Sequence, residues 1–553
     1  MGSSVREILS HKAGRLVFLA LWLGLHVFCR TTFLNDPGTF SHTAYGEAML
    51  RQGSLLRADI FTSSRQGQPW IAQQWLGEIV MALLHRIAGL DALLLAASLL
   101  VALIFSFLWL RLYESGMHLL LTGLLLAFGL ASASMQFLVR PLLFTMAALA
   151  WLFALLVDVE AERRPVSHLW RTLPVFWLWA NIHGGYLGGF GTLGLCVAGW
   201  GILYLSGRRG PIGNGRHLFT ALAVVPAAGL MSVLGPYGID LPRTWATIVD
   251  SPLVRQLIVE HLPLYSDANA FAPTLLAIVY LVFLICFSGR SRLEDPLSSG
   301  NPGASRCAPT DSRAGTCAAE ADRDQPQWGC PAGTVRVSWL VPVVWFLLAV
   351  GRVRHAPLFG ITAVIAFAEM YRASPWPESI GSSKPLYGRV YGRPAPRLPF
   401  RTALVLLAVG LWLQASGSAL PLLGRGWAVP ATDRWPMELI PTMRVFADRT
   451  APAASVYTEF NLGSWAVGVE PRLRVSIDDR CELAGDALMR EYAASASDTR
   501  LIASWVAGFG ARAALTTPDS PYDRWFRTAS GWQVIATAEA GIWHERSHSV
   551  SEQ

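Results

Sequence analysis

The sequence predicts a polytopic α-helical membrane protein, with about eleven transmembrane helices and a small C-terminal extracytoplasmic α/β domain. Hydrophobic residues make up 52% of its 553 residues and charged residues only 15%, with a mean hydropathy of +0.38. Soluble proteins carry nearer a quarter charged residues. Several apolar runs approach the ~20 residues that a helix needs to cross ~30 Å of hydrocarbon. These runs end before Trp427, where a polar segment begins.

The first predicted crossing extends from about Leu16 to Phe28 and follows Arg6, Lys12 and Arg15. The run resembles a signal peptide, but no small-x-small cleavage site follows it, which favours an uncleaved crossing. Basic residues flank the cytoplasmic ends of membrane helices, so we expect the N-terminus in the cytoplasm. Later crossings are expected at residues 90–110, 117–134, 138–157, 170–181, 187–205, 217–235, 271–288, 337–350, 357–371 and 401–419.

The basic loops between these crossings all fall on one side of the membrane if the chain crosses eleven times. They are residues 162–171, 208–216, 290–336 and 372–401, together with Arg111. Loops of this kind are cytoplasmic, so the net charge of +7 reflects topology and does not indicate nucleic-acid binding. An odd number of crossings then places the C-terminal segment outside the cytoplasm.

Two segments of the predicted transmembrane domain, residues 1–425, differ from ordinary crossings and short loops. Residues 71–89 are apolar enough for a short crossing, but Glu78 and His85 favour an interfacial helix that closes a first external loop over 31–89. The segment 289–336 is rich in Gly, Ser, Pro and Asp, which predicts a disordered cytoplasmic loop.

Residues 426–553 are predicted to form the α/β domain. Short runs with strand-like patterns lie at 454–460, 472–479, 511–517 and 532–545. Amphipathic patterns of helical period lie at 483–494 and 499–510.

Six clusters of polar residues interrupt the hydrophobic runs, and the eleven-crossing topology puts all of them on the external side. Ionisable groups at membrane depth are costly and usually mark a substrate path or a catalytic site. We therefore expect the clusters to line one cavity. Their members are Asp36 with His42, Glu78 near Trp75, Arg140, Asn181 with His183, Glu260 with His261, and Arg352, Arg354 and His355.

Asp36 is the main candidate for chemistry. It follows the first crossing directly, and we expect Pro37 to end any helix there. A carboxylate at the membrane–water boundary can act as a general base or can ligate a divalent cation such as Mg²⁺ or Mn²⁺. The alternative is a structural Asx turn, although the neighbouring polar clusters favour the chemical role. Glu78 lies among apolar residues and therefore needs a partner or a wet cavity.

The arginines are candidates for binding phosphate, because a guanidinium binds phosphate oxygens bidentately. Arg140 suits a lipid-linked phosphate, with snorkelling to lipid headgroups as the alternative. Arg352 and Arg354, beside His355, face outward against the positive-inside bias. Bound phosphate or pyrophosphate would compensate them, or else carboxylates from other loops would pair with them.

The remaining candidates lie where external turns are expected. Asn181 and His183 are flanked by tryptophan and by glycines that suit tight turning and close packing. Glu260 and His261 form either a second acid–base pair or part of an ordinary surface. Tyr237 lies in a Pro-Tyr-Gly turn.

In their order along the chain, these motifs resemble the GT-C superfamily of multi-pass glycosyltransferases. They are most similar to bacterial membrane proteins of the protein mannosyltransferase and aminoarabinose transferase branch. The resemblance covers nearly the whole chain apart from the loop 289–336. The matching motifs are D-P-x-T-F-x-H at Asp36, G-x-P-W-x-x-x-x-W-L-x-E at Gly67, R-P-L-L-F at Arg140, W-A-N-x-H-G-G at Trp179, P-Y-G at Pro236, R-x-R-H at Arg352, and EFNLGSWAVG, SIDDR and GFGARAALTTPDS near the C-terminus.

The resemblance implies transfer of a sugar from an undecaprenyl-type phosphate carrier, with inversion, at the external face of a bacterial inner membrane. It implies that Asp36, with His42 and Glu78 beside it, activates the acceptor or binds a metal. It also implies that Arg140, Arg352 and Arg354 hold the carrier phosphate. Aromatic residues would pack against the sugar, namely Trp70, Trp75 and Tyr237.

Two features depart from the family pattern. Many GT-C enzymes carry paired acids in the first loop, whereas here His42, Glu47 or Asp59 would have to supply the second group. Gln73 and Gln74 stand where related chains often have His or Glu. A non-catalytic scaffold with the same fold is therefore one alternative. A transporter is another, although it predicts internal repeats, which the sequence lacks.

Overall fold

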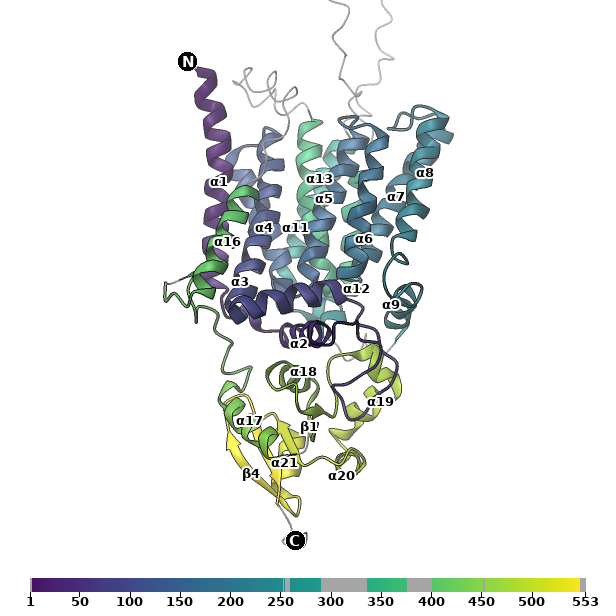
Figure 1. Cartoon of the computed structure of the whole chain (residues 1–553). Coiled ribbons are helices and arrows are strands. Elements are labelled where there is room, and N and C mark those ends of the chain that lie inside the picture. The colour runs from purple at the N-terminus through teal and green to yellow at the C-terminus, as the bar shows by residue number, and fades with distance from the viewer. Residues whose placement is uncertain are drawn as a thin grey trace, which may run out of the picture.

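The chain forms a bundle of roughly parallel helices with a smaller domain beyond one end, as the computed structural model shows (Figure 1). The structure describes residues 2–251, 253, 259–289, 336–374, 400–420, 422–450 and 453–547. The predicted disordered loop 289–336 therefore lies almost wholly outside the described residues. The bundle helices are α1 (Gly2–Phe28), α3 (Trp75–Glu114), α4 (Leu119–Ala133), α5 (Leu142–Glu160), α6 (Thr172–Ile182), α7 (Tyr186–Leu205), α8 (Gly215–Leu230), α11 (Phe271–Gly289), α12 (Val341–Gly351), α13 (Ala356–Arg372) and α16 (Phe400–Ala415).

Each predicted crossing overlaps one of these helices, and successive helices alternate in direction (Figure 1). Five helical segments are both long enough and apolar enough to cross a membrane. They are Trp75–Glu114, Leu119–Gln136, Leu142–Glu160, Tyr186–Leu205 and Val353–Arg372. A helical membrane protein is thus confirmed, while the count of eleven crossings stays a prediction.

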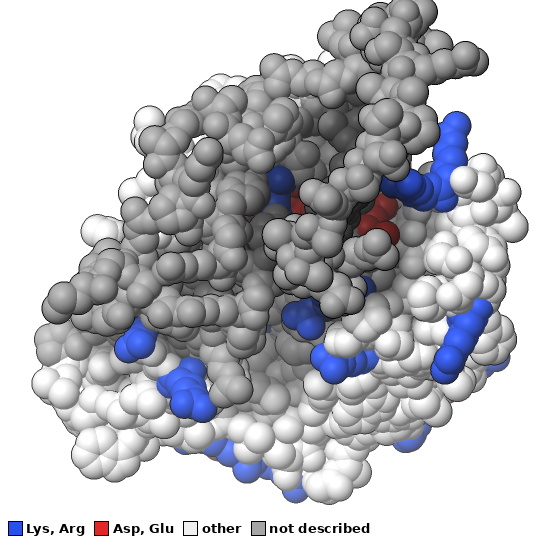
Figure 2. Space-filling model, turned by 90° about the horizontal axis from the view of Figure 1, so that it is seen from above, with Lys and Arg blue, Asp and Glu red and all other residues white. Residues whose placement is uncertain are grey.

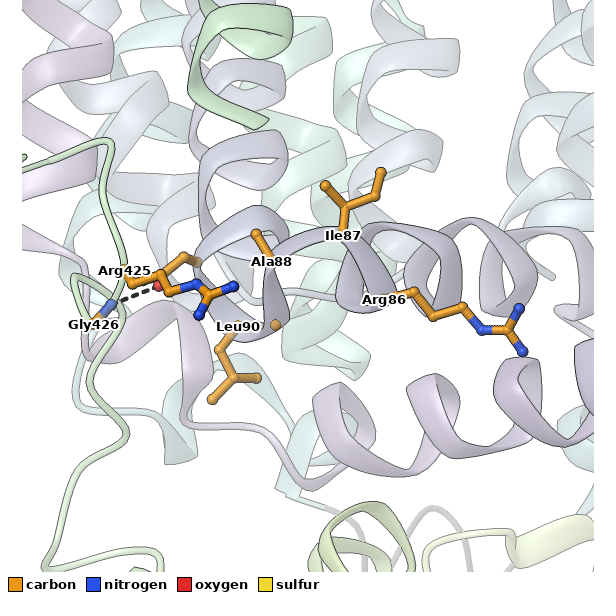
Figure 3. A pocket seen from close by; sticks show the side chains of 8 residues that line it. Arg86, Ile87, Ala88, Leu90, Arg425 and Gly426 are labelled. Atoms are coloured by element: carbon orange, nitrogen blue, oxygen red, sulfur yellow. Dashed lines mark hydrogen bonds between the residues drawn. The ribbon is translucent and has the colours of Figure 1, made fainter. Parts of the chain in front are cut away.

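Helix α3 turns sharply at Ala88 and Gly89, where the backbone leaves helical values. The part before this kink lies across the lower end of the bundle in Figure 1, and the part after it runs along the other helices. Asp91 follows the kink and accepts hydrogen bonds from Gly426 N (2.7 Å) and Ala428 N (2.6 Å). The connection to the C-terminal domain is thereby tied to a shallow hollow at the kink (Figure 3).

Helix α2 (Pro37–Gln52) corrects one expectation. We expected Pro37 to end a helix, but it is the first residue of α2, and Asp36 is the N-cap. Proline suits this position because its missing N–H would have no intrahelical partner in the first turn. The Asp36 side chain accepts a hydrogen bond from Gly38 N at 2.7 Å, so the first loop begins as a capped helix beneath α3.

The C-terminal domain contains a five-stranded mixed sheet in the order β2-β1-β3-β5-β4. Strand β1 is parallel to β2 and β3, and β5 is antiparallel to β3 and β4. The predicted strands and two predicted helices are all present, and α17, α18 and α21 are additional. The elements are β1 (Ser455–Thr458), β2 (Arg474–Val475), β3 (Ala513–Thr516), β4 (Trp532–Thr537), β5 (Ile542–Arg546), α17 (Ile440–Arg449), α18 (Phe460–Val469), α19 (Cys481–Ser495), α20 (Thr499–Gly508) and α21 (Pro521–Thr528).

Arginines from four predicted cytoplasmic segments meet at the opposite end of the bundle. Asp158 pairs with Arg111 and Arg163, each at 2.8 Å. Glu369 pairs with Arg163 at 2.7 Å and also with Arg336 and Arg372. Figure 2, which looks onto this end, shows acidic side chains recessed among basic ones. The ion pairs tie α3, α5 and α13 together far from the C-terminal domain.

Glycines allow α2 to approach its neighbours at backbone distance. A Cβ on Gly46 would lie 2.0 Å from the Glu78 carbonyl oxygen of α3. A Cβ on Gly468 of α18 would lie 2.4 Å from the Phe40 Cβ of α2. Helix α2 is therefore held closely between the bundle and the C-terminal domain.

We expect Gly46→Ala to lower the free energy of unfolding by about 1–3 kcal/mol, because overpacking forces α2 and α3 apart. The control is Gly24→Ala in α1, where a Cβ meets nothing within 4 Å. That control should be neutral or slightly stabilising, since alanine favours helix over glycine. Thermal unfolding of the purified protein measures both changes. An unchanged melting temperature for Gly46→Ala would contradict this packing.

Candidate functional site

The polar clusters meet at the end of the bundle that faces the C-terminal domain. Arg140, just before α5, connects two carboxylates that are far apart in the sequence. Its Nη1 donates to Asp36 Oδ2 at 3.1 Å and to Glu260 Oε1 at 2.5 Å. Three separate segments of the chain are thus joined through one guanidinium.

The two carboxylates differ in their titration. Burial raises the pKa of Asp36, and the charges of Glu260 and Asp479 add to this against the opposing charge of Arg140. Burial also opposes ionisation of Glu260, but the charges of Arg140 and Arg354 outweigh it and lower its pKa. The surroundings thus favour proton uptake at Asp36 and the ionised form at Glu260.

His42 and Glu78 form a second pair beside the first. His42 lies on α2, six residues after the Asp36 cap, and its Nδ1 is 2.9 Å from Glu78 Oε1. Burial opposes protonation of His42, but the hydrogen bond and charge of Glu78, with the charge of Asp479, outweigh it and raise its pKa. Glu78 is buried, and its Oε2 has no hydrogen-bond partner among the described residues. The partner that Glu78 required is therefore His42.

Asn181 and His183 lie at the end of α6 but make different hydrogen bonds. Asn181 is buried; its Oδ1 accepts from Trp75 Nε1 at 2.8 Å and its Nδ2 donates to Trp177 O at 2.8 Å. These bonds position the start of α3. His183 Nδ1 accepts from Gly185 N at 2.9 Å. Burial and the positive charges of Arg354, Arg140 and His42 lower the pKa of His183, so a neutral imidazole faces the cluster.

Arg354 lies against His261, with Nη1 2.6 Å from His261 Nε2. Burial and the charges of Arg354 and Arg352 lower the pKa of His261 to about 3, so this histidine is neutral near pH 7. Within the described parts of the chain, Arg354 has no carboxylate within ion-pair distance. The neighbouring His355 packs its ring on Trp345, with ring centroids 5.7 Å apart.

The aromatic residues that were expected to contact a sugar are engaged in contacts within the protein. The Tyr237 hydroxyl donates to Leu56 O at 2.7 Å and accepts from Ala72 N at 3.3 Å. Trp70 is buried, and its Nε1 donates to Glu482 at 3.1 Å. Trp75 binds Asn181, as described above. These side chains hold the first loop in place, and their contact with a sugar stays a prediction.

A buried ion cluster of Asp59, Asp478 and Arg480, here called the Arg480 cluster, fixes the C-terminal domain to the first loop. Arg480 Nη2 lies 2.7 Å from Asp59 Oδ1 and 2.5 Å from Asp478 Oδ2. Its guanidinium carbon is 4.9 Å from the ring centre of Tyr45 and 4.5 Å from that of Trp70. Thr62 also forms a parallel bridge with Val475, at the edge of the sheet.

Asp59 and Glu47, two residues that were expected to supply a second acid in the first loop, both pair with arginines instead. Asp59 is fully engaged with Arg480 and so faces the C-terminal domain. Glu47 pairs with Arg51 and Arg86, each at 2.7 Å, on the outside of α2. Neither contacts Asp36. Sequence reasoning did not single out Asp479, which lies between Asp478 and Arg480. Three consecutive charged residues after a strand were a usable signal for this turn.

A divalent cation does not fit this arrangement. Among the residues that the structure describes, no group of three or more His, Cys, Asp or Glu side chains could hold a metal ion. Arg140 occupies the space between Asp36 and Glu260, where a cation would otherwise neutralise both carboxylates. The described residues thus offer no ligand set for Mg²⁺ or Mn²⁺, and metal dependence stays a prediction.

The helical bundle, the helices across one of its ends and the α/β domain beyond them form an arrangement that solved structures share. The chain matches two crystal structures of the oligosaccharyltransferase from Archaeoglobus fulgidus, one in the apo form and one tethered with an acceptor peptide containing the NVT sequon. Each match has a TM-score of 0.50 at 12% identity and covers 92% of this chain and 69% of the other. The resemblance seen in the motifs is thus confirmed as a shared fold.

A further match is ArnT from Cupriavidus metallidurans bound to undecaprenyl phosphate. It has a TM-score of 0.48 at 13% identity and covers 97% of this chain and 98% of that one. No protein-family model and no curated protein sequence matches the chain.

Proposed function

We propose that the protein is a glycosyltransferase that moves a sugar from a polyprenyl-phosphate carrier to an acceptor. The observation that carries this proposal is the contrast between two arginines of the site. Arg140 is paired with two carboxylates, whereas Arg354 contacts a neutral histidine and, among the described residues, has no carboxylate within ion-pair distance. A buried guanidinium that lacks a carboxylate partner favours an anionic ligand, and phosphate suits its bidentate geometry.

The contacts of Asp36 suit it to act as the base. Gly38 N fixes one carboxylate oxygen, and Arg140 orients the other. In the proposed reaction an acceptor oxygen or nitrogen attacks the anomeric carbon of the sugar. The bond from this carbon to the phosphate oxygen breaks, its electron pair stays on the phosphate, and the acceptor proton passes to Asp36. Direct displacement inverts the anomeric centre.

Under this proposal Arg140 has a different role from the one that the sequence predicted. Its guanidinium already neutralises Asp36 and Glu260, so it positions the base instead of holding the carrier phosphate. Phosphate binding then falls to Arg354, with Arg352 beside it in the same turn. Glu78 raises the pKa of His42 against the effect of burial, which favours a positive charge near Asp36.

The direct test is mass spectrometry of envelope glycans and lipids from cells with the gene, without it, and with Asp36→Asn in its place. We expect one sugar-bearing product to disappear in the deletion and in the Asp36→Asn strain. A polyprenyl-phosphate-linked sugar should accumulate in both. Identical glycan and lipid profiles in all three strains would contradict sugar transfer and favour a non-catalytic scaffold.

The proposal also places the site at the external face of a bacterial inner membrane, with eleven crossings. Support comes from the arginines gathered at the opposite end of the bundle, since basic residues favour the cytoplasm. In a cysteine-free background, a membrane-impermeant maleimide should label Asp433→Cys in intact spheroplasts. It should label Arg209→Cys only after lysis, since both residues are exposed but lie toward opposite ends. The reverse pattern would put the site in the cytoplasm.

A further inference from the structure

The hollow at the kink of α3 is lined by Arg425 and Asp91, whose opposite charges do not pair with each other. Its volume is about 440 Å³, and residues 86–91 of α3 form it together with Arg425 and Gly426 of the connection to the C-terminal domain. Arg425 Nε donates to Gln414 O at 3.2 Å, and the Asp91 carboxylate accepts the two backbone N–H groups described above. Within the described parts of the chain, neither side chain takes part in an ion pair.

The second arginine of the hollow already has a carboxylate partner. Arg86 pairs with Glu47 of α2 at 2.7 Å, and in Figure 3 its guanidinium points away from Arg425. Arg425 is exposed and lies beside Ala88 and Leu90 (Figure 3). The hollow therefore presents one positive and one negative group to a ligand and carries no net charge of its own.

The kink sets the depth of the hollow in the membrane. Before the kink α3 lies across the end of the bundle, and after it residues 90–112 run along the other helices. At about 1.5 Å per residue, this second part is long enough to cross about 30 Å of hydrocarbon, so the hollow lies where the lipid headgroups begin. Leu83 and Ile87, one turn apart on α3, are 45% and 42% exposed. They can contact the acyl chains of a lipid.

We propose that the hollow binds a phospholipid whose headgroup carries both a phosphate and a primary ammonium, as phosphatidylethanolamine does. The phosphate binds the Arg425 guanidinium, which can contact two phosphate oxygens at once. The ammonium donates to Asp91, because each of its carboxylate oxygens holds one backbone donor and can accept a further hydrogen bond. The acyl chains lie along the apolar face at Leu83 and Ile87.

The two charges of the hollow select among lipids. Phosphatidylglycerol brings a phosphate but no positive charge for Asp91. Phosphatidylcholine brings a positive charge, but its quaternary ammonium has no N–H to donate to a carboxylate. Neither lipid satisfies both side chains, whereas phosphatidylethanolamine does.

A lipid in the hollow contacts both sides of a joint in the molecule. One side is the kink, which directs the half of α3 that carries Glu78 across the end of the bundle. The other side is the connection to the C-terminal domain, which Asp91 holds at Gly426 and Ala428. The bound lipid thus stabilises the placement of both parts, and this inference does not depend on sugar transfer.

The test is native mass spectrometry of the full-length protein, titrated with phosphatidylethanolamine, phosphatidylglycerol and phosphatidylcholine. We expect the wild type to bind phosphatidylethanolamine most tightly. Arg425→Gln should lower that affinity about 2- to 5-fold, since a contact at an exposed charge is weaker than a buried one. The control Arg209→Gln, an exposed arginine between α7 and α8 at the opposite end of the bundle, should leave it unchanged. Equal affinity for the three lipids, or an unchanged preference in Arg425→Gln, would overturn the inference.

The contact of the ammonium is tested by changing the lipid, because Asp91→Asn would also weaken the hold on the connection. N-acetylated phosphatidylethanolamine keeps the phosphate and loses the positive charge, so it should bind no better than phosphatidylglycerol. If it binds as tightly as the unmodified lipid, Asp91 takes no part and the proposed headgroup is wrong. Soluble phosphoethanolamine should bind far more weakly than the lipid. Equal affinity for the soluble compound would assign the hollow to a free aminoalkyl phosphate and would overturn its assignment to a lipid.

Discussion

Replacing Asp36 with asparagine is expected to abolish sugar transfer while leaving folding and donor binding nearly intact. Asparagine is isosteric, and its side-chain oxygen can still accept the hydrogen bond from Gly38 N that caps α2. It cannot accept a proton at neutral pH. Loss of a positioned general base typically lowers the rate ~10²–10⁴-fold. The measurement is single-turnover transfer by purified protein, together with its thermal unfolding.

Two controls separate the proton-transfer role from the capping role. Asp240→Asn changes an exposed carboxylate at the start of α9 (Asp240–Asp250) and should leave transfer unchanged. Asp36→Ala removes the cap as well and should also lower stability by about 1 kcal/mol. Near-wild-type turnover in Asp36→Asn, with reduced stability in Asp36→Ala, would show that Asp36 is a helix cap and nothing more.

Replacing Arg354 with alanine is expected to weaken polyprenyl-phosphate binding about 10- to 150-fold. A charge-assisted contact contributes roughly 1.5–3 kcal/mol, and each 1.4 kcal/mol changes affinity tenfold. Arg354→Lys should recover only part of the loss, because an ammonium cannot form the bidentate contact. Binding to the purified variants in nanodiscs is the measurement.

The matched control is Arg243→Ala, because Arg243 lies on the surface of α9 and pairs with the exposed Asp240. It should bind the carrier phosphate normally. The double variant of Arg352 and Arg354 tests whether the two act together. If carrier affinity is unchanged in Arg354→Ala and in the double variant, while thermal stability falls, these arginines are structural.

The sequence predicted the parts of the fold that depend on local pattern. Long apolar runs predict the bundle helices. Short runs with turn residues at both ends predict the strands of the C-terminal domain. Helix α2 was missed because its mixed composition has no apolar stripe and because Pro37 was interpreted as a stop. The tertiary contacts at Gly46 and Gly468 explain why this polar segment is buried.

The sequence predicted that the polar clusters lie together, but it did not predict which of their residues pair. The polar clusters do converge, because a buried ionisable group needs other polar groups near it. The sequence could not show that Arg140 would take two carboxylates and leave Arg354 beside a neutral histidine. It could not show the Arg480 cluster either, because this cluster joins Asp59 of the first loop to residues of the C-terminal domain, which follow all of the bundle helices.

The Arg480 cluster also sets when the first loop can reach its final position during synthesis. The Tyr45–Asp478 contact joins residues 433 positions apart, so the first loop must wait for almost the entire chain. Closing so long a loop is entropically costly and is favourable only once the helices between have packed. A nascent or prematurely terminated chain can therefore insert every bundle helix and still lack the turn that carries Asp478 and Arg480. The contact between the first loop and the C-terminal domain is therefore a late event of biosynthesis, because both of its partners must first be synthesised.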